Sequence, residues 1–268
     1  MSASRARRGP AAQADPAHYS YTHYASAEVA EGFDALRFSG GIGRMLLEAQ
    51  ERILVDALRP GPGVSIADVG TGTGRAALAL AASGADVVGI DASGEMLAVA
   101  GRRAAERPET PAGSLRFEQG DAHALPLADR SVDAAVCLRV LMHTPDWRRC
   151  LAELCRVACA TVVFDFPAAA SAAAVQAGVR RIAHAAGLKT EPYRVMSARA
   201  VRRELARHGW RVRAEHRQFV LPIALHKAIG SPGFTRGVER ALAMTGALRL
   251  FGSPVTIVAE RAGSGTPS

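Results

Sequence analysis

The sequence predicts an α/β fold in which a mostly parallel sheet is covered by helices on both faces. Its 268 residues are 49% hydrophobic and 22% charged, a composition typical of a globular domain with a substantial core and unlike that of disordered or collagen-like chains. From residue 64 onward, short apolar runs alternate with longer amphipathic stretches. This alternation is typical of right-handed strand–helix–strand units, which build parallel sheets.

Each predicted strand is a short run rich in apolar and β-branched residues. The first five runs cover 64–69, 86–90, 115–118, 134–140 and 161–166. Helices between them are predicted from apolar residues at three- and four-residue spacing, at 74–83, 94–106 and 147–158. Ser93 and Asp146 stand at N-cap positions, and Gly84 follows the end of the first of these helices.

Further elements flank this alternating region. Helices are predicted before it at 26–38 and 42–58, and after it at 168–186, 198–208, 223–229 and 234–250, with strands at 210–221 and 254–260. We therefore expect one domain. Its parts are a flexible tail at 1–17, an N-terminal helical cap at 18–59, a ligand-binding core at 60–166, a C-terminal part with helical insertions at 167–261 and a second flexible tail at 262–268.

The net charge of +8 is concentrated in the second half of the chain. Residues 1–146 contain 14 arginines and 18 acidic residues, whereas residues 147–268 contain 19 basic and 7 acidic residues. The segment 178–217 alone contains 11 basic and 3 acidic residues. Such asymmetry attracts nucleic acid or acidic small molecules, but 31 arginines beside 2 lysines also fit a compositional bias toward arginine.

The cysteines and the apolar runs limit the possible classes further. Cys137, Cys150, Cys155 and Cys159 form no Cys-x-x-Cys pair and lie near no histidine at zinc-ligand spacing, so we expect reduced thiols in the cytoplasm and no metal site. No apolar run approaches the about 18 residues that a membrane-spanning helix needs. We therefore expect no transmembrane segment.

A glycine-rich turn follows the first predicted strand, in Asp68-Val69-Gly70-Thr71-Gly72-Thr73-Gly74. Glycines let the backbone turn sharply and approach a ligand closely, and the following helix offers unpaired N–H groups. By itself this pattern also fits a dinucleotide site, because Asp91 follows at about the distance of a ribose-binding acid.

Three acidic residues favour a different ligand. Asp68, Asp91 and Asp121 each follow or close a predicted strand, so in a parallel sheet they meet at the carboxyl edge, where ligands bind. A carboxylate directly before the glycines suits an ammonium group and is unfavourable beside a pyrophosphate. The pattern therefore favours a cationic nucleoside over NAD.

At these residues the chain resembles the class I S-adenosylmethionine-dependent methyltransferases, particularly the small-molecule group called type 11. The resemblance covers about residues 60–165 and depends on four motifs in order: DVGTGTG, VVGIDASGEML, GDAHALPLADRSVD and VLMHTPDWRRCLAELCRV. It implies a Rossmann-like fold with a mostly parallel seven-stranded sheet, an N-terminal helical cap and late helical insertions. It also implies S-adenosyl-L-methionine as the cofactor.

The resemblance assigns roles to individual residues. Asp68, Gly70 and Gly72 hold the methionine part, Asp91 accepts hydrogen bonds from the ribose, and Asp121 faces the adenine amino group. Gly74 allows close helix packing, Met96 packs near the adenine and the Ala122 N–H faces a ring nitrogen. The expected cofactor contacts are completed by Thr71, Ala92 and Leu138.

The acceptor side is described less fully by the sequence. His143 follows the fourth strand, where an imidazole serves as a general base or orients the substrate, or else only packs the loop. Arg139 stands where the family more often has a small polar residue, and it could pair with a substrate carboxylate or with a residue of the N-terminal cap. The aromatic stretch 18–24 would close over the methyl donor, or simply fasten the cap to the domain.

We expect transfer of a methyl group to a hydroxyl or activated carbon of a small apolar or aromatic acceptor. The signature of many amide and nucleic-acid N-methyltransferases is missing after the fourth strand, where Leu138-Arg139-Val140 stands. Two alternatives remain open. One is an RNA methyltransferase that uses the basic segment 178–217, and the other is an NAD-binding oxidoreductase or nucleotide-binding module. The sequence predicts no oligomeric state.

Overall fold

The computed structural model describes residue 21 and residues 28–32, 39–107, 113–187 and 193–263. The seven strands are β1 Ser65–Val69, β2 Asp86–Asp91, β3 Leu115–Gln119, β4 Val132–Cys137, β5 Ala158–Phe166, β6 Trp210–Phe219 and β7 Ser253–Arg261. The labelled helices are α3 Gly40–Leu58, α4 Arg75–Ala82, α5 Gly94–Ala105, α6 Trp147–Val157, α7 Ala172–Ala185, α8 Ala198–Arg207, α9 Ile223–Ile229, α10 Pro232–Met244 and α11 Ala247–Phe251.

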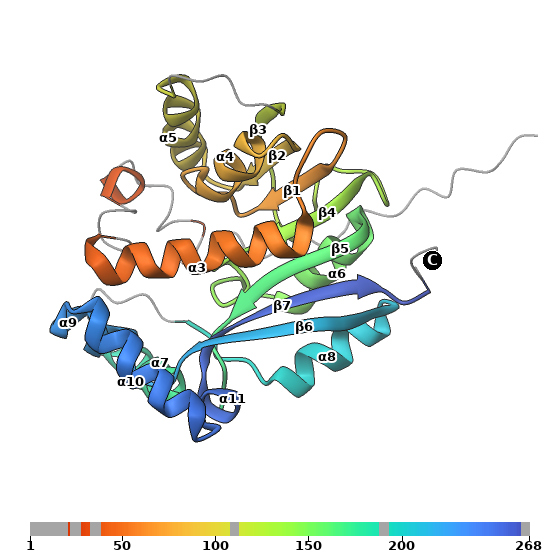
Figure 1. The fold of residues 1–268 in the computed structure, drawn as a ribbon. Coiled ribbons are helices and arrows are strands. Elements are labelled where there is room, and N and C mark those ends of the chain that lie inside the picture. The colour runs from red at the N-terminus through yellow and green to blue at the C-terminus, as the bar shows by residue number, and fades with distance from the viewer. Residues whose placement is uncertain (1–20, 22–27, 33–38, 108–112, 188–192, 264–268) are drawn as a thin grey trace, which may run out of the picture.

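The seven strands form one sheet in the order β3-β2-β1-β4-β5-β7-β6 (Figure 1). The pairs among β1 to β5 are parallel, and β7 runs antiparallel to both β5 and β6. The predicted mostly parallel sheet is therefore confirmed. Chain order reverses between β1 and β4, which is the point where open α/β sheets bind ligands.

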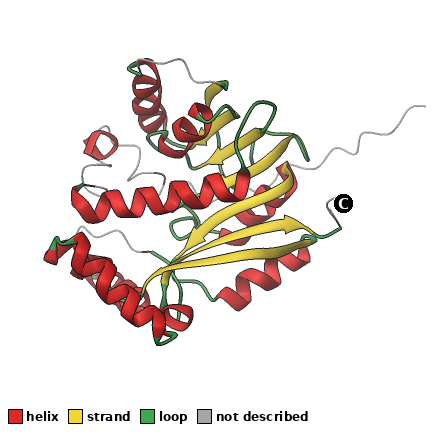
Figure 2. Cartoon of the chain, in the orientation of Figure 1, coloured by secondary structure: helices red, strands yellow, loops and turns green. Residues whose placement is uncertain are grey.

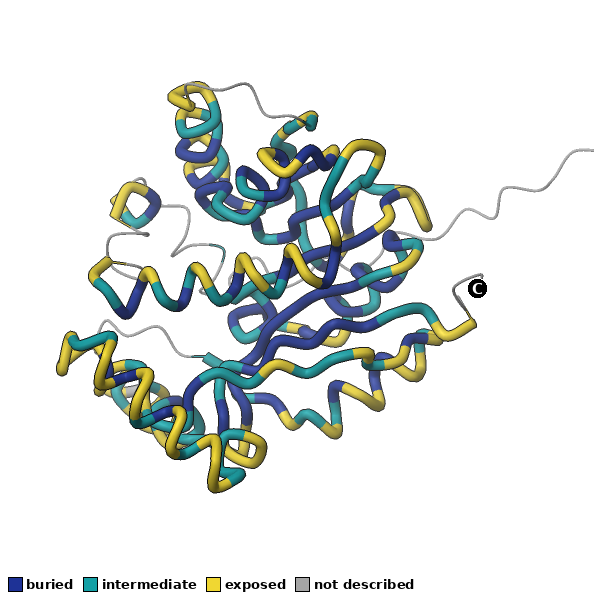
Figure 3. Tube along the Cα trace, in the orientation of Figure 1, coloured by how far each residue is buried: buried dark blue, intermediate teal, exposed yellow. Residues whose placement is uncertain are grey.

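Helices cover both faces of the sheet (Figure 2). Residues of β1 alternate between the two faces, as the two-residue period of a strand requires. Ala67 and Val69 belong to the core that α6 and α8 cover, whereas Ile66 belongs to the core that α3 and α4 cover. The strands β1, β2, β4, β5 and β7 are consequently mostly buried, whereas the edge strands β3 and β6 are largely half-buried or exposed, and the helices keep an exposed outer side (Figure 3).

The observed elements differ from the predicted ones at several places. The fourth strand ends at Cys137 rather than at residue 140, because Arg139 adopts a left-handed conformation with φ 63°. The predicted helix 234–250 is two helices, α10 and α11, divided at Gly246 with φ 80°. The helix predicted from residue 168 begins at Ala172 after its N-cap Ser171. The helix α3 packs on the sheet as part of the core rather than forming only a cap.

Some predictions concern residues outside the described ranges. The tail at 1–17 lies outside them, and so do residues 264–268 of the tail predicted at 262–268. Of the helix predicted at 26–38, the structure describes 28–32, which are helical. Within the described residues, no helix is both long and apolar enough to cross a membrane. The domain boundaries themselves stay a prediction.

Candidate functional site

The turn between β1 and α4 is held against β2 by its own backbone. The N–H groups of Gly70 and Thr71 both donate to the carbonyl of Ile90, at 2.7 and 3.0 Å. Gly70 has φ 71°, and a Cβ at this position would lie 2.2 Å from Cγ2 of Val140. Gly72 also has a positive φ, and the space where its side chain would stand is open. The turn therefore needs glycine for its conformation and leaves room for a ligand.

Asp68 lies at the end of β1, beneath this turn. Its side chain is buried, with 2% of the residue exposed, and Oδ2 accepts a hydrogen bond from Thr71 Oγ1 at 2.7 Å. Burial raises the pKa of Asp68 to about 6, although the Thr71 hydroxyl opposes this rise. A cationic group bound beside Asp68 would stabilise the ionised carboxylate.

Asp91, at the end of β2, connects the glycine turn to the start of α5. Its Oδ2 accepts from the Gly72 N–H at 2.8 Å, and its Oδ1 accepts from the Ser93 N–H at 2.9 Å. Ser93 in turn caps α5, because its hydroxyl accepts from the Met96 N–H at 3.0 Å. Burial raises the pKa of Asp91, and these backbone hydrogen bonds counteract that effect.

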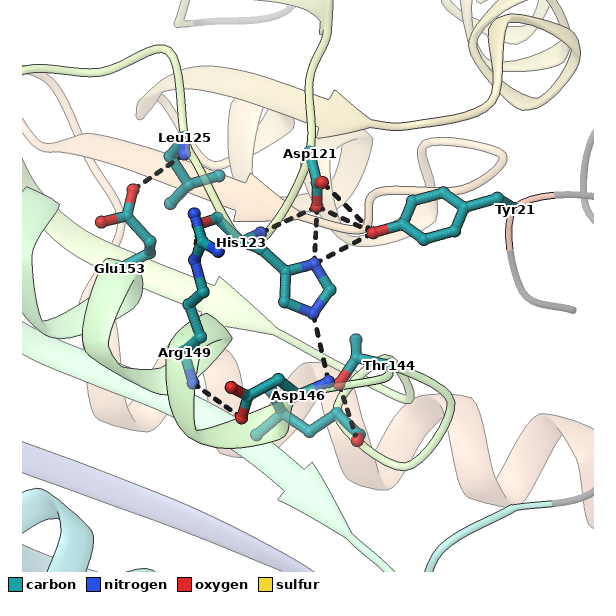
Figure 4. Close-up of polar contacts among 9 residues, drawn as sticks. Tyr21, Asp121, His123, Leu125, Thr144, Asp146, Arg149 and Glu153 are labelled. Carbon is teal, nitrogen blue, oxygen red and sulfur yellow. Dashed lines mark hydrogen bonds and ion pairs between the residues drawn. The ribbon is translucent and has the colours of Figure 1, made fainter. Parts of the chain in front are cut away.

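Asp121 follows β3 and forms a cluster with His123 and Tyr21 (Figure 4). Nε2 of His123 lies 3.4 Å from the N–H of Asp146 and accepts from it, so the ring proton belongs on Nδ1. That Nδ1 donates to Asp121 Oδ1 at 2.7 Å, and the His123 N–H donates to the same oxygen at 2.8 Å. The Tyr21 hydroxyl lies 3.2 Å from both oxygens of Asp121.

These contacts determine the charge of the cluster. Burial alone would raise the pKa of Asp121, but the hydrogen bonds from His123 outweigh it and hold the pKa below its ordinary value. Burial and the neighbouring Asp121 carboxylate raise the pKa of Tyr21, so this hydroxyl stays protonated and donates. Asp121 is thus an ionised acceptor whose side chain is 31% exposed.

The loop that presents Asp121 is fastened to α6 (Figure 4). Glu153 accepts from the Leu125 N–H at 2.8 Å and pairs with Arg156 at 2.6 Å. Arg149 Nε donates to the carbonyl of His123 at 2.9 Å. Because both contacts come from one rigid helix, the position of the loop is fixed independently of any ligand.

One cavity lies against these three carboxylates, and we call it the first cavity. Of the residues predicted from the sequence, it is lined by Asp68, Gly70, Thr71, Gly72, Asp91, Ala92, Met96, Asp121, Ala122, Leu138 and His143. Gly74 does not line it. A Cβ at Gly74 would lie 2.9 Å from Cβ of Ala100 and 3.1 Å from Phe117, so this residue permits close packing of α4 against α5 and β3.

The first cavity is also lined by residues that the sequence analysis did not assign to the cofactor site. They are Tyr21, Thr73, Arg75, Ala76, Ser93, Gly120, His123, Arg139, Val140 and Thr144. Tyr21 belongs to the aromatic stretch expected to close over the methyl donor. His123 is the most informative omission, because it stands two residues after a predicted site acid, where a short turn can bring the two side chains together.

A second cavity, of about 520 Å³, adjoins the first at His143 and Arg139, which line both. His143 is buried, and its N–H donates to the Val140 carbonyl at 2.8 Å. The Arg139 N–H donates to Asp165 Oδ1 at 2.5 Å, which explains the left-handed turn after β4. Burial raises the pKa of Asp165, while the positive charge of Arg139 opposes the rise.

The basic segment 178–217 is partly neutralised by ion pairs within the fold. Four of its arginines pair with glutamates, two of them with Glu215, and these arginines are Arg202, Arg207, Arg211 and Arg217. Among the described residues, no group of three or more histidine, cysteine or acidic side chains could hold a metal ion. The four cysteines are free thiols, and three of them are buried.

Comparison with known proteins relates this geometry to a family. Residues 67–162 match the family model described as "Methyltransferase domain". A demethylmenaquinone methyltransferase of Renibacterium salmoninarum is 41% identical over 106 residues, which are 40% of this chain and 41% of that protein. An uncharacterized 37.1 kDa protein of Streptomyces fradiae is 42% identical over 108 residues, 39% of this chain and 30% of that protein. The chain thus matches less than half the length of these curated relatives.

Solved structures match a larger part of the chain. Magnesium protoporphyrin IX methyltransferase from Synechocystis PCC 6803, with bound S-adenosylhomocysteine, has a TM-score of 0.66 at 16% identity. The match covers 92% of this chain and 100% of that one. At this identity the similarity shows the fold, which is the Rossmann-like class I methyltransferase fold. Residues 67–162 thus match a methyltransferase domain model, and the fold is that of the class I S-adenosylmethionine-dependent methyltransferases.

Proposed function

We propose that this protein transfers a methyl group from S-adenosyl-L-methionine to a hydroxyl or activated carbon of a small apolar or aromatic acceptor. The observation that supports this most strongly is the arrangement of three carboxylates around one cavity. Asp68, Asp91 and Asp121 follow or close β1, β2 and β3, and all three line the first cavity. Carboxylates suit an ammonium group, ribose hydroxyls and an adenine amino group.

The side chains fit this cofactor one by one. Asp68 is a buried carboxylate with a raised pKa, which an ammonium group would complement. Asp91 is oriented by two backbone N–H groups, so its remaining lone pairs can accept from ribose hydroxyls. Asp121 is an ionised acceptor, which suits an exocyclic amino donor. Met96 supplies an apolar side chain to the same cavity.

When bound, the cofactor supplies an electrophilic methyl group on a good leaving group. The protein then has to position the acceptor and remove its proton where the nucleophile needs it. His143 is the residue we assign to that step, because it lines both cavities and a neutral imidazole nitrogen can accept a proton. Catalysis would come mainly from orientation in a largely buried site.

The two alternatives are less well supported. A pyrophosphate, as in NAD, would lie beside the Asp68 carboxylate, which is unfavourable. An RNA ligand would need the basic segment as a phosphate track, yet four of its arginines already pair with glutamates. A fold of this type serves many chemistries, so the fold alone does not decide between them.

The experiment is a calorimetric titration of the purified protein with S-adenosylhomocysteine and, separately, with NAD. We expect micromolar binding of S-adenosylhomocysteine, lost by at least about 100-fold in Asp68→Ala, because one ion-paired contact is removed in a buried site. NAD should not bind. Binding of NAD alone would contradict the proposal, and RNA binding that weakens steeply with salt would favour the RNA alternative.

A further inference from the structure

The second cavity has an apolar wall built by segments far apart in the sequence. The end of β6 and the residues that follow it contribute 219–224, α3 contributes Leu46, and the loop after β4 contributes Met142. Its larger apolar side chains are Leu46, Met142, Phe166, Phe219, Leu221 and Ile223. Such a wall fits the carbon skeleton of an apolar or aromatic molecule.

The charges on the same lining are unequal in sign. It carries three cations, Arg139, Arg180 and Lys227, and one carboxylate, Asp165, among the residues that the structure describes. Asp165 is buried and adjacent to Arg139, so these two opposite charges balance each other. Arg180 on α7 and Lys227 on α9 are the two further cationic side chains of this lining.

Arg180 is held by an aromatic neighbour. Its guanidinium carbon lies 5.7 Å from the centre of the Tyr193 ring, within the range of a cation–π contact. The Tyr193 ring is itself fixed, since its hydroxyl donates to the Ala173 carbonyl at 3.0 Å. A guanidinium held in this way loses little rotational freedom when it binds an oxyanion.

We propose that the second cavity binds the methyl acceptor as an amphipathic acid. Its apolar body lies against the wall described above, and its carboxylate or other oxyanion group pairs with Arg180 and Lys227. The reacting atom would then point toward His143 and Arg139, where the two cavities meet. The identification of this ligand as the methyl acceptor rests on the proposed function, whereas recognition of an amphipathic acid depends only on the cavity itself.

The test uses two fluorescent probes that share an aryl-naphthylamine skeleton. 8-Anilinonaphthalene-1-sulfonate carries an anionic group, and N-phenyl-1-naphthylamine is neutral. Titration of both is compared between the unmodified protein and the double variant Arg180→Gln/Lys227→Gln. Arg116→Gln, which makes the same kind of charge change on an exposed residue of β3, is the matched control.

We expect the double variant to weaken binding of the anionic probe about 10-fold or more and to change the neutral probe by less than about twofold. Arg116→Gln should change neither probe. Ala173→Trp, which fills the cavity, should weaken both and thereby locate the site. An unchanged affinity for the anionic probe in the double variant, or an equal loss for both probes, would overturn the proposal.

Titration of the same variants with S-adenosylhomocysteine separates this proposal from the proposed function. The double variant should keep its affinity for S-adenosylhomocysteine, while Asp68→Ala should lose it and still discriminate between the probes. A protein that discriminates between the probes without binding S-adenosylhomocysteine would refute the cofactor assignment alone. A protein that binds S-adenosylhomocysteine without charge-dependent probe binding would refute the acid-binding cavity alone.

Discussion

Two pairs of a histidine and a carboxylate have nearly the same geometry but lie in different surroundings. His123 Nδ1 is 2.7 Å from Asp121, and His226 Nε2 is 2.8 Å from Glu239. Both histidines are buried, at 3% and 0% exposure. The carboxylates differ, because the side chain of Asp121 is 31% exposed and lines the first cavity, whereas that of Glu239 is 10% exposed.

Both carboxylate oxygens of Glu239 accept hydrogen bonds from the protein itself. Its two oxygens accept from the N–H groups of Val220 and Leu221 at 2.8 and 3.0 Å, and the other side of the His226 ring contacts Thr235 at 3.1 Å. The pair thus joins α9 and α10 to the segment after β6, which is part of the wall of the second cavity. The same interaction stabilises the fold in one region and, in the proposed binding mode, positions a ligand-binding carboxylate in the other.

The largest expected effect is on the stability contributed by the buried pair of His226 and Glu239. Glu239→Ala removes one partner of a buried pair and leaves two backbone N–H groups without their acceptor, so we expect a loss of about 4 kcal/mol in the free energy of unfolding. Urea unfolding measures it, with the exposed Glu48→Ala as control. Below the unfolding transition, affinity for S-adenosylhomocysteine should stay unchanged. A loss under about 1 kcal/mol would show that the pair is not structural.

The second effect concerns the pH dependence of stability that Asp68 causes. Its pKa is raised from the ordinary 3.8 to about 6, so between these values the folded state binds more protons than the unfolded state. The free energy of unfolding should therefore fall as pH rises from about 4 to about 6, by up to about 3 kcal/mol.

Asp68→Asn isolates this contribution, because the amide does not titrate. We expect the variant to be less sensitive to pH over this range than the unmodified protein, and more stable than it at neutral pH without ligand. Urea unfolding at pH 4.5 and 7.5 provides the comparison. Identical pH profiles for the two proteins would mean that Asp68 is not held in a buried, unfavourable ionised state.

The third effect is the opposite of that expected for Glu239, because we expect a loss of ligand affinity with little loss of stability. Asp121→Asn replaces one carboxylate oxygen by a donor, which repels the adenine amino group in the proposed binding mode. We expect affinity for S-adenosylhomocysteine to fall about 30-fold, or about 2 kcal/mol, with a change in stability below about 1 kcal/mol. Calorimetry and urea unfolding measure the two quantities. A variant that loses stability but not affinity would place Asp121 with the structural pairs.

The contrast between the two regions also shows what the sequence could predict. Asp68, Asp91 and Asp121 were found because each follows an apolar run, and parallel strands bring such positions to one edge of a sheet. Neither the local pattern nor any spacing pointed to Glu239 and His226, which are 13 residues apart and meet only through the packing of two helices. The apolar periodicity after the fifth strand predicted helices there, but it did not indicate which side chains of those helices would pair with each other.

Arg139 shows the same limit at a single residue. The apolar run 134–140 predicted a strand through this position, yet the strand ends at Cys137. The cause is a hydrogen bond from the Arg139 N–H to Asp165, which is 26 residues away along the chain. A local pattern cannot reveal a long-range contact of this kind, and that contact is what places Arg139 between the two cavities.

The smallest expected effect tests whether His123 acts only by positioning Asp121. His123→Ala removes the Nδ1–H donor and should weaken binding of S-adenosylhomocysteine about fivefold, or about 1 kcal/mol. His123→Asn, whose amide N–H can stand near Nδ1, should restore affinity to within about twofold of the unmodified protein. A structural role without positioning would destabilise both variants and leave their affinity equal. Only a positioning residue is rescued in affinity by the conservative variant, so the ratio of the two affinities decides the role.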